Sequence, residues 1–410
     1  MSPSSLLQLL LLGLIVAAGP LAYVWAQRGT GALDQPGRRG TVPGARARKL
    51  VWVILFLTFD LILFGAFTRL TDSGLGCPDW PGCYGSSNPF TAQAAIKAAQ
   101  AAQPTGPVTL TKAWIEMIHR YLAMGVGVLI MALVALAWRL RRAAKPDPGA
   151  PPLSGAVALL ILVCVQGAFG AWTVTLKLMP LIVTIHLLLA VTLLCALGVM
   201  AARLGASAHR AVPVQVLAPV PAPAPALRSA QLQLPARGWV TLALAAVFVQ
   251  IALGGWVSTN YAVLACPDFP LCHGQVFPAQ TDFASGYELL RPLGVRADGS
   301  HLPVEALVAI HWTHRAFALV VFGTVAWAAA QLLRHPLADP GSKQLAWWLL
   351  ALLLLQLLTG ISTVIFSWPV AVAVLHNGGA AVLALTLVLL RTRLAPRQSA
   401  ALAPSAMVMS

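Results

Sequence analysis

The sequence is poor in charged residues. Only 10% of its 410 residues are charged and 58% are apolar, with a mean hydropathy of +0.78. Soluble domains carry about 25% charged residues, so this shortage argues against a water-soluble enzyme. The apolar residues come in unbroken runs and do not alternate along the chain, which excludes a transmembrane β-barrel. The composition therefore predicts an all-α integral membrane protein.

Acidic residues are the scarcer charged class, with 12 Asp and Glu against 27 Lys and Arg, a net charge of +15. In a membrane protein the placement of basic residues matters more than their sum, so we do not predict nucleic-acid binding. If every helix crosses, 19 of the 27 basic residues fall on one side. The positive-inside rule makes that side the cytoplasm. The long loops 69–112 and 257–304 then face outward, into the periplasm of a bacterial inner membrane.

The first apolar run, 5–26, has no Lys or Arg before Arg28. A signal peptide needs a positive segment before its apolar stretch, so we interpret this run as an uncleaved helix, with a signal peptide as the alternative. Eight further runs are each long enough for the ~20 residues of a membrane span. The predicted spans are 5–26, 50–68, 113–138, 154–173, 181–202, 239–257, 305–333, 345–364 and 370–390.

The sequence contains an internal repeat. The segment Cys77-Pro-Asp-Trp-Pro-Gly-Cys83-Tyr-Gly returns 189 residues later as Cys266-Pro-Asp-Phe-Pro-Leu-Cys272-His-Gly. His119-Arg120, His186 and the pattern Gln166/Gly170/Thr173 return as His314-Arg315, His376 and Gln356/Gly360/Thr363. Each half holds four spans, an even number, so both halves keep one orientation. We predict two parallel-repeat four-helix bundles plus an extra N-terminal transmembrane helix.

These features divide the chain into five parts. The first is the extra helix with a basic cytoplasmic connection, and the third is a cytoplasmic linker rich in Pro and Ala. The predicted boundaries are 1–49 for the extra helix, 50–205 for the N-terminal bundle, 206–237 for the linker, 238–392 for the C-terminal bundle and 393–410 for a cytoplasmic tail.

Four of the nine His residues, His119, His186, His314 and His376, lie inside apolar runs. An ionisable side chain in the bilayer is costly and indicates a function. Each lies roughly 9–14 Å below the outer surface at ~1.5 Å per residue. No Cys or carboxylate cluster accompanies them for zinc, so a pair of imidazoles in each half suits the axial positions of a haem. The alternative is that each imidazole only hydrogen-bonds a neighbouring helix.

Glu116 lies three positions before His119, so both project from one face of a helix. The second half has His311 at the matching position, and the repeat is broken there. A carboxylate in this setting is a candidate catalytic acid, base or charge stabiliser. Its alternative role is to hold an imidazole ligand. The asymmetry indicates that one half reacts and the other only holds a cofactor.

Two cysteine pairs lie in the outward loops. The Pro-Asp-aromatic-Pro segment between their members forms turns and can bring the sulfurs together, and an oxidising compartment permits the bond. We predict structural disulfides Cys77–Cys83 and Cys266–Cys272. A redox role for the first pair stays open, and zinc is less favoured because only His273 accompanies the second pair.

Three arginines, Arg69, Arg120 and Arg315, lie near the outer ends of spans. Their guanidinium groups are candidates for binding the carboxylates of a haem edge that faces the surface. Snorkelling of each side chain to the membrane interface explains the same placement without a ligand. A Gly-rich phosphate loop is missing from the sequence, so nucleotide-driven transport has no support.

At these residues the sequence resembles the haem A synthase family of membrane enzymes. The resemblance rests on the four helical His residues, on Glu116-Met-Ile-His119-Arg120 and on Gly65-Ala-Phe-Thr-Arg-Leu-Thr-Asp-Ser-Gly-Leu-Gly-Cys-Pro-Asp-Trp-Pro. It covers about residues 50–392 and leaves the first helix without a role. The resemblance implies oxidation of the C8 methyl group of haem O to a formyl group, which gives haem A for terminal oxidase assembly.

The resemblance also implies a role for each site residue. His119 and His186 would hold the substrate haem, His314 and His376 would hold a haem b cofactor, and Glu116 would be the catalytic carboxylate. Implied partners are the lipid bilayer, a haem O synthase that delivers the substrate and an electron-transfer protein, with self-association left open. The alternatives are a dihaem b-type electron-transfer cytochrome linked to quinol and, less favoured, a haem transporter or chaperone.

Overall fold

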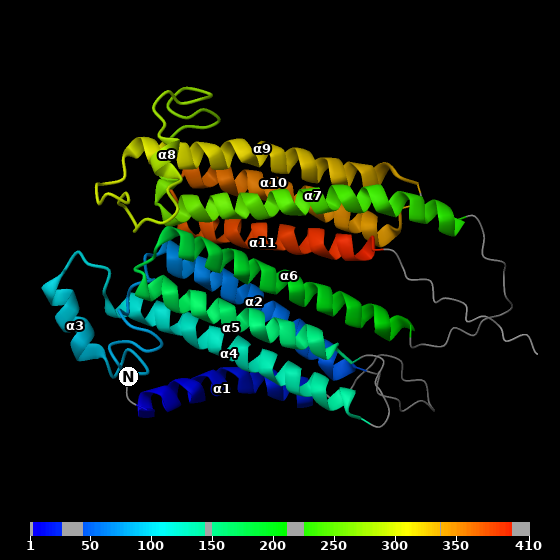
Figure 1. Ribbon diagram of the computed structural model, residues 1–410, viewed down its shortest axis with the longest axis horizontal. Helices are drawn as coiled ribbons and strands as arrows, with labels where there is room; N and C mark the ends of the chain where they lie inside the picture. The colour runs from blue at the N-terminus through cyan, green and yellow to red at the C-terminus, as the bar shows by residue number, and fades with distance from the viewer. Residues whose placement is uncertain (1–2, 27–43, 144–149, 211–224, 337, 396–410) are drawn as a thin grey trace, which may run out of the picture.

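The computed structural model describes residues 3–26, 44–143, 150–210, 225–336 and 338–395. Within these residues, nine helices are long and apolar enough to cross a membrane, and they run along a common direction (Figure 1). The predicted all-α membrane fold is confirmed. The helices are α1 Pro3–Ala26, α2 Ala45–Leu70, α4 Leu110–Arg141, α5 Leu153–Thr175, α6 Pro180–Arg210, α7 Pro225–Thr259, α9 Val304–Arg334, α10 Pro340–Ile365 and α11 Val370–Arg393.

The spanning helices begin where local chemistry satisfies their first backbone N–H groups. Thr109 caps α4 by accepting a hydrogen bond from the Lys112 N–H at 3.2 Å. Asp339 caps α10 by accepting from the Ser342 N–H at 3.1 Å, with Pro340 at the first helical position. A proline is favourable there because its missing N–H would have had no partner within the helix.

The eight helices after α1 form two rings of four. In the N-terminal half, α2 packs against α4, α4 against α5, α5 against α6, and α6 against α2. In the C-terminal half, α7, α9, α10 and α11 close a ring in the same order. Figure 1 shows the second ring stacked on the first. In each ring the second and fourth helices are therefore diagonal, with the core between them.

The two halves meet through α2 and α6 on one side and α7 and α11 on the other. At the end that carries the cysteine loops, Arg69 Nη2 donates to the Ser258 carbonyl and the Tyr261 hydroxyl bonds Asp72 Oδ1, both at 2.7 Å. The members of each pair are 189 positions apart. This offset equals that of the repeated cysteine segments, so equivalent positions of the two halves touch each other there.

Helix α1 lies on the outside of the N-terminal half, against α4 and α2 (Figure 1). It packs closely against α4 because Gly125 of α4 has no side chain. A Cβ placed on Gly125 would lie 2.6 Å from Val16 Cγ1 of α1. The Ser87 hydroxyl also bonds Gln8 Oε1 at 2.5 Å, which ties the helix to the first outer loop. The predicted extra helix is thus packed into the fold.

The linker between the halves is shorter than predicted. Helix α6 continues to Arg210 and α7 begins at Pro225, so the predicted linker 206–237 contains helical residues at both ends. Beyond the Pro-rich stretch, Ala, Leu, Gln and Arg favour helix, which explains the early start of α7. Residues 211–224 and most of the predicted tail lie outside the described residues.

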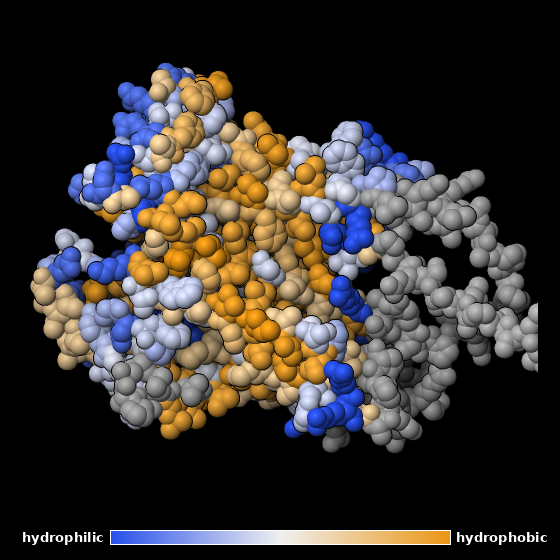
Figure 2. Space-filling view, viewed as in Figure 1, coloured by the Kyte–Doolittle hydropathy of each residue, from blue (hydrophilic) through white to orange (hydrophobic). Residues whose placement is uncertain are grey.

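Hydropathy divides the described surface into a belt and two ends. Figure 2 shows an apolar belt across the middle, with hydrophilic residues at the loop end and again at the opposite end. The loop end contains α3 Gln93–Ala102, the 3-10 turn η1 Ala262–Leu264 and α8 Phe283–Gly286. The opposite end carries basic residues of the helix termini, including Arg139, Arg141 and Arg334. This arrangement is that of a protein embedded in a bilayer.

Candidate functional site

The four helical His residues lie in the interiors of the two rings, each over a glycine of a neighbouring helix. A Cβ built on Gly65 or Gly254 would lie 3.0 Å from Cε1 of His119 or His314. The equivalent distances are 3.2 Å from Gly170 to His186 and 3.3 Å from Gly360 to His376. A glycine lets the backbone approach the imidazole this closely. The contact between a glycine and an imidazole is therefore repeated in both halves.

The two imidazoles of each half are near enough to interact electrostatically, His119 with His186 and His314 with His376. Helices α4 and α6 supply the first pair, and α9 and α11 supply the second. His119 is also stacked on Phe64, with ring centroids 6.3 Å apart and planes 8° apart. Both members of each predicted pair therefore lie in the same helix ring, and their sharing of one metal stays a prediction.

Glutamine side chains brace three of the four His positions. The Nε2 groups of Gln166, Gln250 and Gln356 donate to the backbone carbonyls of His186, His314 and His376 at 3.1, 3.0 and 3.1 Å. Each glutamine lies one helical turn before the glycine that contacts the same imidazole. At the fourth position, opposite His119, the equivalent residue is Leu61. The brace is therefore missing at His119.

Glu116 and Arg120 are buried in α4 and hold the first cysteine loop. Glu116 Oε2 accepts from the Cys77 N–H at 2.9 Å, and Oε1 accepts from Arg120 Nη2 at 2.5 Å. Arg120 Nη1 donates to the carbonyls of Asp79 and Gly82 at 2.8 and 2.5 Å. A charged donor that satisfies several carbonyls fixes a loop well. The Glu116 carboxylate is therefore a rigidly held group.

The C-terminal half builds the same clamp with a different residue. The Cys266 N–H lies 3.2 Å from His311 Nδ1, and Arg315 Nε lies 3.1 Å from His311 Nε2. A neutral imidazole has one unprotonated nitrogen, so it accepts one of these two hydrogen bonds at a time. Arg315 also donates to the carbonyls of Cys266, Asp268 and Leu271 at 2.7 to 3.0 Å. A neutral imidazole thus takes the structural place of the Glu116 carboxylate. The clamp is common to both halves, and the negative charge is specific to the first.

Both cysteine loops are closed in the same way. Disulfides join Cys77 to Cys83 and Cys266 to Cys272. In the second loop, Asp268 accepts from the N–H groups of His273 and Gly274 at 2.7 and 2.8 Å. The backbone N–H of Gly274 is the main group that holds the pKa of the Asp268 carboxyl below its ordinary value. The loops are compact covers at one end of the two helix rings.

The three predicted arginines are engaged with protein groups. Besides its bond to Ser258, Arg69 pairs with Asp72 at 3.2 Å and lies over the Tyr261 ring at 4.3 Å. Arg120 and Arg315 hold the cysteine loops. Their binding to haem carboxylates therefore stays a prediction, and the contacts show an additional role in holding the loops and helix ends.

Sequence reasoning missed two charged residues. Arg291, in the outer loop of the C-terminal half, is fully buried and donates to Asn260 Oδ1 at 2.5 Å, while its Nε has no partner among the described residues. Burial lowers the pKa of this guanidinium. Asp60 lies within α2, inside the apolar belt. The sequence does contain a signal for Asp60, because it is an ionisable residue within a predicted span.

The donor set fits a haem better than a metal held by protein ligands alone. Among the described residues, no group of three or more His, Cys, Asp or Glu side chains could hold a metal ion. A porphyrin supplies four nitrogen ligands to its iron, and the protein supplies the two axial ligands. The Nε2 atoms of His186 and His314 lie 3.4 and 3.5 Å from the amide nitrogens of Gln166 and Gln250. His376 forms its hydrogen bond through Nδ1. One haem in each half fits this arrangement.

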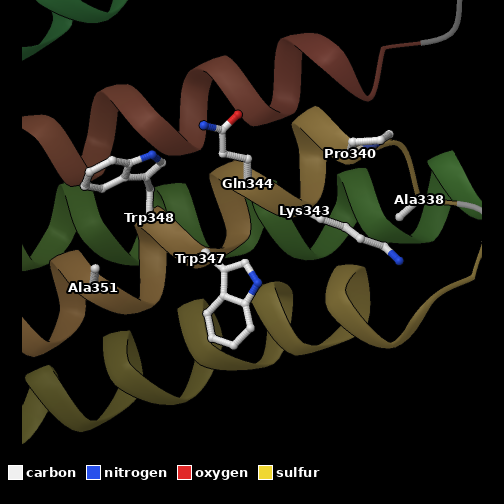
Figure 3. Close-up of a pocket in the computed structure, with 7 residues that line it drawn as sticks. All are labelled: Ala338, Pro340, Lys343, Gln344, Trp347, Trp348 and Ala351. Carbon is white, nitrogen blue, oxygen red and sulfur yellow. The ribbon is translucent and has the colours of Figure 1, made fainter.

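The pockets at the surface lie away from these imidazoles. A pocket of 720 Å³ runs along α10 at its basic end, and Figure 3 shows Trp347 and Trp348 projecting in different directions beside Lys343. Trp347 is 63% exposed. Tryptophan and lysine are common where a span leaves the bilayer, so this surface is consistent with contact to lipid headgroups.

The architecture defines a multi-span membrane protein with a pair of imidazoles in each half, and comparison with known proteins places it in a family. The model of the COX15-CtaA family, described as cytochrome oxidase assembly protein, matches residues 48–388, and the chain belongs to this family. Its curated relatives include haem A synthases. The match leaves α1 outside the family region.

Three such relatives match along most of their length. The haem A synthase of Shewanella oneidensis is 38% identical over 356 residues, which cover 83% of this chain and 95% of the relative. That of Bradyrhizobium sp. strain ORS 278 is 29% identical, covering 88% of this chain and 96% of the relative. That of Caulobacter vibrioides is 27% identical, covering 81% and 91%.

Proposed function

We propose that this protein oxidises haem O to haem A in the membrane. The observation that carries the proposal is the pair of imidazoles inside each helix ring, combined with the family relationship to haem A synthases. The two porphyrins have different fates. His119 and His186 would hold the substrate haem O, and His314 and His376 would hold a haem b, which would supply electron transfer to the substrate site.

The reaction takes place in the N-terminal half, because the halves differ in charge there. Glu116 is buried beside the outer loop, with Arg120 fixing one carboxylate oxygen and the Cys77 N–H the other. Oxidation of a methyl group develops positive character at its carbon. A fixed carboxylate stabilises that charge more in the transition state than in the ground state. His311 offers no such charge in the C-terminal half.

We place the cysteine loops on the periplasmic side of a bacterial inner membrane. The basic residues at the other ends of α4 and α9 support this orientation through the positive-inside rule. A substrate as apolar as haem O reaches the N-terminal ring from the bilayer. A haem O synthase is the proposed supplier, and an electron-transfer protein is the proposed redox partner.

Replacement of Glu116 by Gln tests the catalytic role. Glutamine can still accept the Cys77 N–H, so the loop should stay closed while the negative charge is lost. We expect formation of haem A to fall by about 100-fold or more, the cost of removing one transition-state stabiliser, with haem O accumulating on the protein. Haem masses in extracts of the purified variant provide the measurement.

The control is Glu116→Asp, which keeps the charge and shortens the side chain. It should retain more activity than Glu116→Gln. Wild-type output of haem A from Glu116→Gln, with the disulfide intact, would limit Glu116 to holding the loop and would remove it from the mechanism.

A further inference from the structure

The hydrogen bonding of the imidazoles differs between the two halves. His376 Nδ1 lies 2.8 Å from the Thr359 hydroxyl, whose oxygen can accept a hydrogen bond. The Gln250 amide nitrogen lies 3.2 Å from His314 Nδ1, but it is a donor and cannot accept from an Nδ1–H. The Nδ1 atoms of His119 and His186 are buried and have no hydrogen-bond partner among the described residues. The sequence accounts for this difference, because Thr359 is replaced by Phe169 in the repeat and Gln250 by Leu61.

The direction of the Thr359 bond follows from its other contact. Thr359 is buried in α10, 5% exposed, and its hydroxyl bonds the Leu355 carbonyl at 2.7 Å. A hydroxyl has one proton, and a carbonyl can only accept. The proton therefore goes to Leu355, and the Thr359 oxygen accepts from His376 Nδ1–H. This fixes the tautomer in which His376 Nε2 carries a free lone pair.

A partner on Nδ1–H orients a ligating imidazole and strengthens it as a donor to metal. Such a partner typically changes metal affinity by about 10- to 100-fold. Phe169 has no acceptor, so His186 keeps the same glycine contact without this support. His119 is weaker still, since Leu61 also removes the glutamine brace.

We propose that Thr359 is the positioning residue that makes the C-terminal site retain its haem, and that Phe169 and Leu61 leave the N-terminal site able to release its product. This inference rests on the proposed function, because it assumes one resident and one exchanging haem. All four proposed ligands are histidines, so the ligands themselves do not distinguish a retained cofactor from a released product. The inference assigns that difference to the side chains that contact the ligands. It also explains how two rings with the same glycine contacts serve different purposes.

The test is haem transfer from the purified full-length protein to excess apomyoglobin, with each transferred pigment identified by its mass. In the wild type, haem O and haem A should leave at least tenfold faster than haem b. Thr359→Val removes the hydroxyl, and loss of haem b should accelerate by about 10- to 100-fold. Its midpoint potential should also rise, because a weaker imidazole donor stabilises the ferric state less. Phe169→Thr should slow the release of haem O.

Two control variants keep the test decisive. Thr359→Ser restores the hydroxyl and should return haem b loss to the wild-type rate. Thr386→Val removes a hydroxyl of similar burial, 7% exposed, which bonds only the Val382 carbonyl at 2.7 Å, and should have no effect. If Thr359→Val loses haem b no faster than Thr386→Val, the inference is wrong and the proposed function stands. A wild-type protein that binds no haem would instead overturn the function.

Discussion

At the scale of single residues, the sites are shaped by glycines as much as by histidines. Each of the four imidazoles contacts a glycine of the preceding spanning helix, and any side chain at that glycine would overlap the imidazole. Introducing atoms into a packed interior costs about 1–3 kcal/mol. Beside a metal ligand, the added atoms would displace the imidazole. We therefore expect substitution of these glycines to reduce haem binding as much as substitution of the histidines does.

Replacement of Gly254 by Val tests this expectation. A Cβ at Gly254 would lie 3.0 Å from His314 Cε1, and the valine methyl groups would come closer. We expect the haem b content of the purified variant to fall by about tenfold, consistent with an overpacking cost of about 1–3 kcal/mol. Gly238→Val, in the same helix at a position with open space around it, is the control. Equal haem content in both variants would refute the packing argument.

The sequence revealed the histidines but not their surroundings. His119 and His314 stand out because an ionisable residue in an apolar run is costly. The repeated pattern Gln166/Gly170/Thr173 was visible, yet sequence alone does not show that the glutamine braces a carbonyl and the glycine supports a ring. The threonine of that pattern bonds its own helix, at 2.7 Å to the Gly170 carbonyl. Such distinctions depend on which faces meet, and only the fold determines that.

At the scale of elements, the cysteine loops depend on arginines from the spans. Arg315 donates to three loop carbonyls and to His311, and Arg120 makes a comparable set of bonds in the other half. Hydrogen bonds from charged groups are worth about 1.5–3 kcal/mol each. The loops should therefore open rarely while these donors are present.

Arg315→Gln should loosen the second loop. Loss of even one of these charged hydrogen bonds amounts to about 1.5–3 kcal/mol of local stability, which raises the population of open loop by about tenfold or more. The rate at which a phosphine reductant cleaves the Cys266–Cys272 disulfide measures this opening. Arg296→Gln changes an exposed arginine in the same outer loop and serves as the control. An unchanged reduction rate in Arg315→Gln would contradict the clamp.

The long elements were predictable and the short ones were not. All nine predicted spans are helices, because lipid leaves the backbone no partner except itself. The ends extend beyond the apolar runs, as at Arg141 and Arg334, since a helix continues into polar residues that reach the headgroups. Helices α3 and α8 went unpredicted because they lie in polar loops where tertiary contacts decide the backbone.

At the scale of the whole molecule, the two halves are held together by close helix packing. Small residues allow membrane helices to approach closely. A Cβ on Gly198 of α6 would collide with Leu385 of α11, and a Cβ on Gly378 of α11 would collide with Leu63 of α2. The interface therefore keeps the two rings, and the two proposed haems, at a fixed separation.

Gly198→Leu should weaken this interface. The added side chain has to displace Leu385, which costs about 1–3 kcal/mol, so the midpoint of thermal unfolding in detergent should fall. Gly205→Leu introduces the same residue into the same helix at a position with open space and should leave the midpoint unchanged. If both variants unfold at the wild-type temperature, the glycine does not determine how closely the halves pack.

The central claim is that each helix ring binds one iron porphyrin between two imidazoles, and that one of these porphyrins is a substrate. The most direct measurement is the mass of the pigments extracted from the purified protein. The account predicts haem b together with haem O or haem A, with haem b lost in His314→Ala and the other pigment lost in His119→Ala. Haem b alone in both halves would indicate a dihaem electron carrier and would contradict the account.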